Sequence, residues 1–598
     1  MITNPNSAIQ RIKNHLSYKL GQELIKYNTG GGGVISLLFK LYHIKKTHHK
    51  LTQFRKTLEL ARADLAYPPL RQCFDFNEAL WVKTWLTYRL GRVLLECDRD
   101  KLKGGYFKFF SKIKQAKKEF KALKESKVYR LKDKLKFKNE KDFDLFIKNY
   151  ALIENLLTHY EALNEVIVLN MAFVLEHFDE VSLWLNSKEF KEKYEDINHP
   201  YPPLLNPDKL NDENYILNYE KIPAEKAWEM NLPLPRRYEF VFWGSHGVGN
   251  FGLSTFLKKL NLNLVYYTCQ QDSSIDYKNI YKELICKDLT HYLSIRNFTT
   301  NNKFFQLLPP QISSLHLVRD PISVLKHHIN FNWKGKNYIS IIPFGTSCKD
   351  IMCNRIGYVP VKKGPTSENP SLECIERLLD NSRSVVFHDA ILYKTLKNAN
   401  ALRDIYIIDM SEIINNRAFE TMTQLAKKFN FNFPKIEDLN FYNTNIGSYN
   451  TLLPINIKLR KEYEGNIIFC LHCKARASIM NMVNCAELIG LKHEKFSIFV
   501  DQVYLKDFRE YLVSKQNLNS VKKYVNDMIK ALNLQKEIED KKKFNENDLL
   551  KFFKENKNIS QKFKNILDEE MALIKQNRPD IVASWKYYKE FEKMCENL

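Results

Sequence analysis

The chain has 598 residues, a formal net charge of +23 and an apolar fraction of 44%. Such a length predicts several domains, and the 13% of aromatic residues argues against a disordered chain. No apolar run approaches the 18 residues of a membrane-spanning helix, and the first residues lack the apolar segment of a signal peptide. We therefore expect a cytoplasmic protein, with at most a peripheral contact at the inner membrane face.

The positive charge is concentrated in the first quarter of the chain. Residues 1–150 hold 33 lysines and arginines against 14 acidic residues, and the rest of the chain is nearly neutral. Such a module suggests an anionic partner, either anionic lipid, a charged polysaccharide or nucleic acid, although a solvated lysine-rich helical surface has the same composition. Because no motif for reading nucleic acid accompanies the charge, we expect no nucleic-acid partner.

The cysteines and acidic pairs give little support to a metal site. Eleven cysteines are scattered through the chain, which is typical of a reducing compartment. The pair Cys470 and Cys473, with Cys485 beyond, lacks the second pair of a zinc site. The Asp98–Asp100 segment resembles the metal-binding carboxylates of some glycosyltransferases, but it lies in the basic module. We expect no metal.

A repeat marks the N-terminal module. The segment Ile12–Ile25 matches Val82–Leu95 at an offset of 70, with six of 14 positions identical. Both copies have the apolar spacing of an amphipathic helix and precede glycines and a basic segment. The stripe of Phe107, Phe109 and Phe110 suits either a helix core, which we favour, or a membrane surface.

Changes of composition predict the remaining boundaries. Residues 1–125 form a basic helical repeat module and residues 126–200 a helical connector. Prolines in 201–237 indicate a linker. In 238–517 short apolar runs alternate with helical patterns, which predicts an α/β domain with a parallel sheet. Residues 518–598 read as a C-terminal helical region.

The stretch "FVFWGSHGVGNFGLSTFLKKLN", Phe240–Asn261, has the pattern of a strand, a glycine-rich loop and a helix. Glycines allow the amides at a helix N-terminus to approach a phosphate closely. The lysine and hydroxyl that end the phosphate loop of ATPases and GTPases are missing, so nucleotide hydrolysis is not expected. The candidate donor-binding residues are Ser245, Gly247, Val248, Gly249, Asn250, Gly252, Ser254 and Thr255, the last two expected in the first helical turn.

The segment "SSLHLVRDPISVLKHHI" is the second phosphate candidate. It places Arg319 directly after a predicted strand, with Asp320 as the cap and Pro321 as the first residue of a helix. An arginine at a strand end points into the crevice where open α/β sheets bind ligands, and its planar fork suits a phosphate. Ser323, in the first turn of that helix, is a further donor-binding candidate.

These two segments, together with "DIYIIDMSEIINNRAFETMTQLAKKFNFNFP", resemble the sulfotransferase superfamily between about residues 238 and 434. The resemblance implies that the loop grips the 5′-phosphate and Arg319 the 3′-phosphate of a 3′-phosphonucleotide donor. Two residues depart from that family: its basic loop residue is represented at best by His246, and its later hydroxyl falls on His327.

Phrases such as "RIKNHLSYKLGQELI" and "IKQNRPDIVASWKYYKEFEKMCE" extend a closer resemblance over most of the chain. They are similar to Campylobacter capsule transferases, most of all to the O-methyl phosphoramidate transferases. This resemblance implies a transferase that moves a phosphoramidate group from a 3′-phosphorylated cytidine diphosphate donor to a capsular sugar hydroxyl. The donor is then a co-substrate, and no tightly bound cofactor is expected; the pattern does not address Mg²⁺.

Histidines are the candidate bases for such a transfer, because a neutral imidazole can accept the proton of an attacking hydroxyl. We rank His246 first because it lies in the loop. The other candidates are His327 and His328, two turns into the predicted helix after Arg319, and His388, which precedes Asp389 after the predicted strand 384–387. The alternatives are a polysaccharide sulfotransferase with a 3′-phosphoadenosine donor, a glycosyltransferase, and a non-enzymatic scaffold for capsule assembly.

Overall fold

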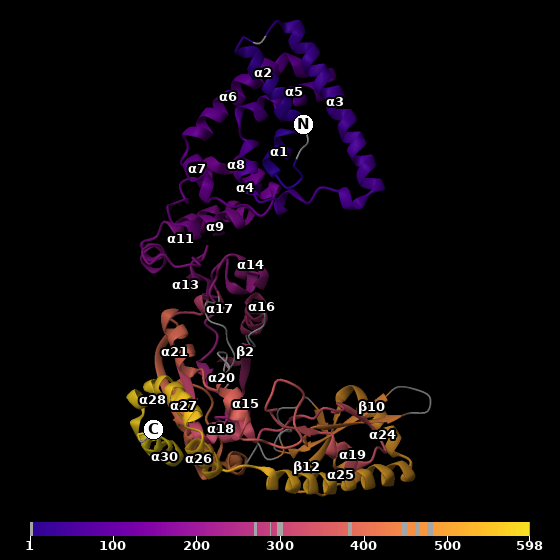
Figure 1. The fold of residues 1–598 in the computed structure, drawn as a ribbon, viewed down its shortest axis with the longest axis vertical. Helices are drawn as coiled ribbons and strands as arrows, with labels where there is room; N and C mark the ends of the chain where they lie inside the picture. The colour runs from indigo at the N-terminus through magenta and orange to yellow at the C-terminus, as the bar shows by residue number, and fades with distance from the viewer. Residues whose placement is uncertain are drawn as a thin grey trace. The chain divides into compact units, whose positions relative to one another are not determined.

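A computed structural model describes most of the chain, and its residues form two compact units, Met1–Pro233 and Leu234–Leu598. Figure 1 shows the elements of both. The described residues are 4–30, 32–267, 272–286, 289–295, 303–380, 386–444, 449, 452–460, 466–474 and 482–596.

In its described residues the first unit consists of helices joined by irregular segments. Each copy of the repeat is a short helix, a sharp break and a longer helix. The break falls at equivalent positions, because His15 and Trp85 share backbone angles of φ −60° and ψ 145°. The helices are α1 Ala8–Lys13, α2 Leu16–Asn28, α3 Val34–Ala61, α4 Phe76–Val82, α5 Leu86–Arg99, α6 Phe109–Glu125, α7 Lys127–Arg130, α8 Glu140–Ile153, α9 Glu161–Leu169, α10 Met171–Glu176, α11 Phe178–Leu185, α12 Lys188–Phe190, α13 Pro207–Leu210 and α14 Ala224–Glu229.

The two copies of the repeat pack against each other through their shared glycine. A Cβ atom on Gly21 of α2 would lie 1.6 Å from the carbonyl oxygen of Thr87, and one on Gly91 of α5 would lie 1.7 Å from that of Ser17. Because both pairs of positions are related by the repeat offset, the contact is pseudo-symmetric. In Figure 1 the basic helices α3 and α6 flank this central pair on opposite sides.

The predicted linker at 201–237 is packed. Leu204, Leu205, Leu232 and Leu234 are all buried. The carbonyl oxygen of Pro203 accepts a hydrogen bond of 3.0 Å from the Trp184 indole. The proline-rich composition therefore corresponds to short helices and irregular stretches that have their own core contacts.

A five-stranded parallel sheet organises the first part of the second unit and confirms the α/β class. Its order is β2-β3-β1-β4-β8, so β1 lies at the centre between β3 and β4. The predicted strand at 384–387 lies partly outside the described residues, and Val386 and Phe387 are not in a strand. The strands are β1 Val241–Trp243, β2 Leu262–Tyr267, β3 Thr290–Ile295, β4 Ile312–Val318 and β8 Leu402–Asp409.

Helices cover this sheet, and the C-terminal ones are fastened to the ends of its strands. The indole of Trp585 donates to the Asp409 carboxylate at 2.8 Å, and Arg578 donates to the Ile407 carbonyl at 2.6 Å. The helices of this part are α15 Asn250–Lys259, α16 Ser273–Leu284, α17 Lys303–Gln306, α18 Pro321–Ile329, α20 Cys374–Asp380, α21 Asp389–Asn398, α22 Ala418–Phe429, α23 Leu439–Tyr442, α26 Glu546–Glu555, α27 Lys557–Glu570, α28 Ala572–Asn577, α29 Pro579–Ser584 and α30 Lys586–Cys595.

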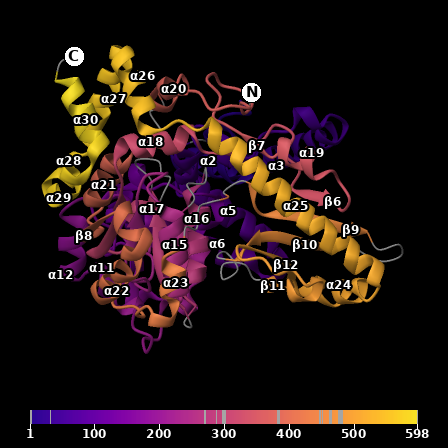
Figure 2. The same ribbon diagram turned by 90° about the horizontal axis from the view of Figure 1, so that it is seen from below.

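A second five-stranded sheet was not predicted. Its order is β11-β12-β10-β9-β6, mostly antiparallel, and the long helix α25 covers one face of it. Figure 2 shows α25 lying along these strands. The elements are β6 Ile341–Pro343, β9 Ile455–Arg460, β10 Asn466–Cys473, β11 Met482–Asn484, β12 Phe496–Asp501, α19 Cys348–Cys353, α24 Leu505–Leu512 and α25 Lys515–Lys542, and a separate ribbon pairs β5 Trp333–Lys334 with β7 Ile356–Gly357.

Within the described parts of the chain, no helix is both long enough and apolar enough to cross a bilayer.

Candidate functional site

The loop after β1 leads directly into the N-terminus of α15. Its glycines Gly244 and Gly249 have the G-x-x-x-x-G spacing of a phosphate loop. Gly247 and Gly249 have φ values of 91° and 109°, a left-handed conformation that favours glycine. The loop therefore has both the spacing and the backbone conformation that bring helix N-terminal amides toward an anion.

Asn250 occupies the position that a lysine holds in ordinary phosphate loops. Its amide nitrogen Nδ2 donates to the carbonyl oxygens of Gly244, at 2.9 Å, and Ser245, at 3.1 Å. Its Oδ1 atom is buried and has no hydrogen-bond partner among the described residues. The side chain thus closes the loop on itself and leaves one buried acceptor unused.

The other predicted loop residues have different surroundings. Val248 is 2% exposed in the core, so only its backbone is available to a ligand. A Cβ atom on Gly252 would meet nothing within 4 Å. The expected placement of Ser254 and Thr255 in the first turn is wrong, because α15 begins at Asn250 and both lie in its second turn. The hydroxyl of Thr255 donates to the Phe251 carbonyl at 2.8 Å.

Arg319 follows β4 and contacts the loop directly. Its Nη1 donates to the carbonyl oxygen of Gly247 at 2.9 Å. The chain leaves β1 toward β2 and leaves the neighbouring β4 toward β8, in opposite directions across the sheet. The loop and Arg319 therefore meet at a topological switch point, where open α/β sheets bind their ligands. Burial lowers the pKa of Arg319, and the nearby Glu546, Asp320 and Asp409 oppose that shift.

The start of α18 matches its prediction and is tied to the C-terminal helices. One oxygen of Asp320 caps α18 by accepting from the amide of Ile322 at 2.9 Å. Its other oxygen accepts from the amides of Tyr587 and Tyr588 in α30, both at 3.2 Å. The Ser323 hydroxyl donates to Glu546 at 2.7 Å and is therefore engaged with α26.

Histidines from three segments lie around the loop. The Nε2–H of His328 donates to the carbonyl oxygen of His246 at 2.9 Å. A Cβ atom on Gly247 would lie 3.0 Å from the His327 ring. Burial lowers the pKa of His327 to about 3 and that of His328 to about 4, and neighbouring positive groups add to both shifts. Both rings are therefore neutral near pH 7 and weak as proton acceptors.

His388 caps α21 without a side-chain cap bond, and it is buried. It directly precedes Asp389, whose carboxylate accepts from the backbone amide of Ser245 at the start of the loop.

A buried polar network is hydrogen-bonded to the start of the loop. The ring of His316 in β4 stacks on Trp243 with centroids 3.9 Å apart, and its Nε2–H donates to the Asp389 carboxylate at 3.0 Å. The same carboxylate oxygen accepts from the backbone amide of Ser245 at 3.3 Å. Glu570 in α27 accepts from the backbone amide of Asp389 at 2.9 Å. The polar residue within the apolar strand "SSLHLV" was the available sequence signal for His316.

The two carboxyl groups of this network ionise differently. Burial opposes ionisation of Asp389, but the hydrogen bond and charge of His316 outweigh it, and the pKa of Asp389 is lowered. Burial, reinforced by the charge of Asp389, raises the pKa of Glu570 to about 8. Near pH 7 Glu570 is therefore mostly protonated beside an ionised Asp389.

A cavity of about 280 Å³ opens beside Arg319. Two of its lining residues, Asn330 and Phe544, are hydrogen-bonded to each other. Asn330 Nδ2 donates to the Phe544 carbonyl oxygen at 2.7 Å, and the Phe544 amide donates to Asn330 Oδ1 at 3.0 Å. Four basic side chains, two aromatic rings and two side-chain amides line the cavity. The basic residues are Arg319, Lys326, His327 and Lys543, the aromatic ones Phe331 and Phe544, and the amides Asn330 and Asn332. Lys543 and Phe544 were missed because they are more than 200 residues from Arg319 in the sequence.

The candidate metal ligands do not come together. Cys470 and Cys473 are three residues apart in β10, so their side chains point to opposite faces of the sheet. Asp98 accepts from the Tyr106 hydroxyl at 2.8 Å and pairs with Lys45. Across the described ranges, no cluster of three or more histidine, cysteine or acidic side chains is arranged to hold a metal.

Two family models match separate parts of the chain. Residues 407–598 match a family described as a protein of unknown function, DUF2972, and residues 1–122 match a domain of unknown function, DUF8374. No curated protein and no solved structure matches the chain. The glycine loop and Arg319 lie between the two matched ranges, whereas Lys543, Phe544, Glu546 and Glu570 lie within the C-terminal one.

Proposed function

We propose that the second unit is a group transferase that takes its donor from a 3′-phosphorylated nucleotide and transfers a phosphoramidate group to a sugar hydroxyl. In this proposal the core is sulfotransferase-like, and the protein belongs with the capsular phosphoramidate transferases that its sequence resembles. The acceptor is a capsular polysaccharide.

The contact between Arg319 and the Gly247 carbonyl carries the proposal. It joins a glycine loop at a helix N-terminus to a guanidinium group at the switch point of a parallel sheet. The two phosphates of one donor could therefore be held side by side, the 5′-diphosphate by the loop and the 3′-phosphate by Arg319.

The residues of the loop favour transfer over nucleotide hydrolysis. Asn250 stands where a phosphate-loop lysine would stand, and Phe251 stands where a metal-binding hydroxyl would follow. The Asn250 amide is turned onto the loop carbonyls, so it supplies no charge to a terminal phosphate.

The cavity beside Arg319 suits the rest of the nucleotide. Its rings, Phe331 and Phe544, can contact a base, and Lys326 and Lys543 add positive charge near a 3′-phosphate. Both lysines are paired with carboxylates, which reduces the net positive charge. Lys326 Nζ lies 2.6 Å from Glu546 Oε1, and Lys543 Nζ lies 2.7 Å from Asp540 Oδ1.

In the transfer step, the acceptor hydroxyl oxygen forms a bond to phosphorus while the bond from phosphorus to the nucleotide's bridging oxygen breaks. The hydroxyl proton passes to a base, and the nucleotide phosphate leaves with the electron pair. We assign the base to His246, because His327 and His328 have pKa values too low for efficient proton acceptance near neutral pH. The loop amides and Arg319 offset the charge that develops on the transferred group.

A binding experiment tests the site. Calorimetric titrations compare cytidine 3′,5′-bisphosphate, adenosine 3′,5′-bisphosphate, the 5′-monophosphates and a uridine diphosphate sugar. The substitution Arg319→Gln should weaken binding of the bisphosphates by about thirtyfold and leave the monophosphates nearly unaffected, because one charge-assisted phosphate contact is lost. The exposed Arg417→Gln is the matched control.

The loop is tested in the same titrations. Gly247→Ala should weaken binding of all the nucleotides, because alanine is strained at the positive φ of this position and would press on His327. The matched control is Gly345→Ala, which introduces the same backbone strain outside the loop, meets nothing within 4 Å and should change binding little. Equal effects of the two alanine variants would remove the loop from the site. A preference for the adenosine compound would favour a sulfotransferase, and a preference for the sugar nucleotide a glycosyltransferase. If no nucleotide binds, the result favours the non-enzymatic scaffold over the transferase.

Deletion of the gene followed by mass analysis of the capsule identifies the transferred group. The proposal requires the loss of a phosphoramidate-sized modification, and an unaltered capsule would contradict it.

A further inference from the structure

The long helix α3 has two apolar faces, and only one of them is covered. Leu37, Leu41 and Ile44 pack into a cluster with Leu20 of α2 and Leu94 of α5. A second stripe at helical spacing stands on the other side of the helix and is more than half exposed: Ile35, Leu38, Phe39 and Tyr42.

The turn before α6 exposes a second apolar group. Phe107 is 95% exposed and Leu102 is 94% exposed, and Tyr106 and Phe110 are also exposed. The expectation that the phenylalanine stripe forms core is therefore wrong for Phe107 and Phe110, and it holds only for Phe109, which packs beside α5 and α3. Exposed aromatic groups of this size commonly mark an interaction surface.

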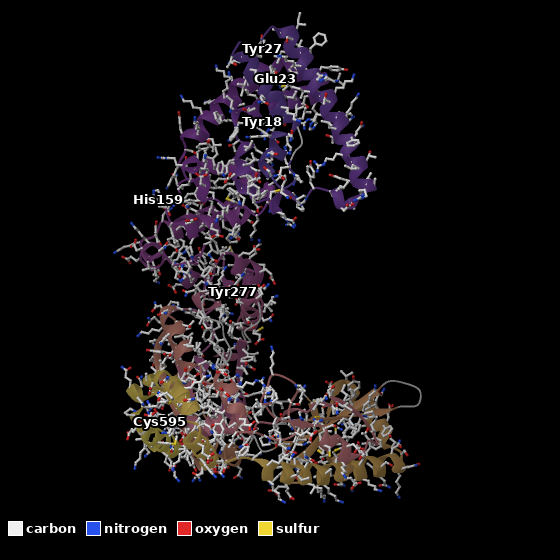
Figure 3. All side chains as sticks on the ribbon, viewed as in Figure 1. Tyr18, Glu23, Tyr27, His159, Tyr277 and Cys595 are labelled. Atoms are coloured by element: carbon white, nitrogen blue, oxygen red, sulfur yellow. The ribbon has the colours of Figure 1, made fainter. Side chains whose placement is uncertain are left out.

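The two groups belong to one end of the first unit. Asp98, near the end of α5, pairs with Lys45 of α3 and also accepts from Tyr106. In Figure 3 the labelled residues Tyr18, Glu23 and Tyr27 follow α2 toward the end where Figure 1 shows α3 beginning. We call the eight side chains the apolar rim: Ile35, Leu38, Phe39, Tyr42, Leu102, Tyr106, Phe107 and Phe110.

Lysines surround the apolar rim. Lys40 and Lys46 lie on α3 among its exposed residues, and Lys101, Lys103 and Lys108 alternate with the apolar residues of the turn. All five are exposed. This arrangement, apolar side chains ringed by positive charge, is that of a surface that inserts shallowly into a bilayer interface rich in anionic lipid.

We propose that the apolar rim docks the protein onto an anionic lipid surface. The pseudo-symmetry of the repeat presents the start of α3 and the start of α6 together, so both insert at once. An acidic polysaccharide would pair with the lysines, but it offers no apolar medium for Phe107, Phe110 and Leu102. The inference is independent of the transferase proposal, because it uses no residue of the second unit.

Vesicle sedimentation of the full chain tests this docking. Vesicles of phosphatidylcholine alone are compared with vesicles that contain phosphatidylglycerol, at low and high salt. We expect binding to the anionic vesicles that weakens as salt rises. The double substitution Phe107→Ser and Phe110→Ser should reduce the partition coefficient by roughly tenfold or more, because two buried rings are lost from the interface.

The control is Phe74→Ser, which removes an equally exposed ring (86%) outside the apolar rim and should leave binding unchanged. All variants should retain the thermal melt of the native chain, since these side chains are exposed. Equal losses for Phe74→Ser, or equal binding to neutral vesicles, would overturn the proposal. So would a concentration-dependent dimer that the double variant abolishes, because the apolar rim would then cover a second copy of the chain.

Discussion

At the scale of single residues, the pair of Asp389 and Glu570 links the C-terminal helices to the candidate loop. Glu570 accepts from the start of α21, and Asp389 accepts from the amide of Ser245. The Asp389 carboxylate therefore positions the loop, and the start of its helix, α21, is in turn held by the protonated Glu570. A change in the ionisation of Glu570 should therefore affect the stability of the second unit.

The raised pKa of Glu570 fixes the sign of that effect. Its carboxyl keeps its proton in the folded state up to a pH of about 8 but loses it near pH 4.5 when unfolded. Between these values the folded state binds more protons, so the free energy of unfolding falls as the pH rises, by on the order of a few kcal/mol. Glu570→Gln should flatten this dependence between pH 6 and 9 in urea denaturation curves.

Glu555→Gln, at an exposed position near the end of α26, is the control and should retain the pH dependence of the native chain. If Glu570→Gln keeps the full slope, Glu570 is not the titrating group.

Part of this candidate site could be predicted from the sequence alone. Arg319 and the loop were predictable because each follows a strand of apolar residues, and the ends of parallel strands share one edge. Glu570, Lys543 and Phe544 were not predictable, because they arrive from distant helices whose packing depends on tertiary contacts. Asp389 was visible only as the neighbour of His388, without its partner His316.

At the scale of elements, the repeat helices show where a sequence pattern fixes packing. The shared glycine of the repeat was evident in both copies, and the structure gives its reason, a crossing of α2 and α5 too close for any side chain. The break before each long helix was not evident, since the apolar spacing continues through it.

Replacing the crossing glycine should destabilise the first unit. A Cβ atom on Gly21 would overlap the Thr87 carbonyl, so Gly21→Ala must separate α2 from α5 and should lower the free energy of unfolding by about 2–4 kcal/mol. The measurement is the midpoint of urea denaturation followed by helical circular dichroism.

Gly33→Ala is the matched control. Gly33 has a φ of −77°, and an added Cβ would meet nothing within 4 Å, so its effect should stay within about 0.5 kcal/mol. Similar midpoints for the two variants would mean that α2 and α5 do not cross closely.

At the scale of the whole molecule, the predicted α/β region contains two sheets. The first was predictable from alternating strands and helices. The second was not, because its strand β6 is separated from β9 by more than 100 residues that include β8 of the first sheet. Interleaving of this kind leaves no local signature in composition or periodicity.

The division into Met1–Pro233 and Leu234–Leu598 has a thermodynamic consequence. Each unit has its own buried clusters: those of the repeat helices in the first, and those of the two sheets in the second. Units with separate cores unfold as separate cooperative transitions. Calorimetry of the full chain should therefore show two transitions, and the two substitutions argued above serve to assign them.

Gly21→Ala should lower only the midpoint of the transition that belongs to Met1–Pro233. Glu570→Gln at pH 9 should raise only the midpoint of the transition that belongs to Leu234–Leu598. The assignment can be checked by hydrogen exchange, which should show the amides of α2 and α5 opening with the first transition and those of β1 and β4 with the second. A single transition shifted by both substitutions would show that the two units unfold as one, and the buried clusters would then have to be coupled through the segment that joins them.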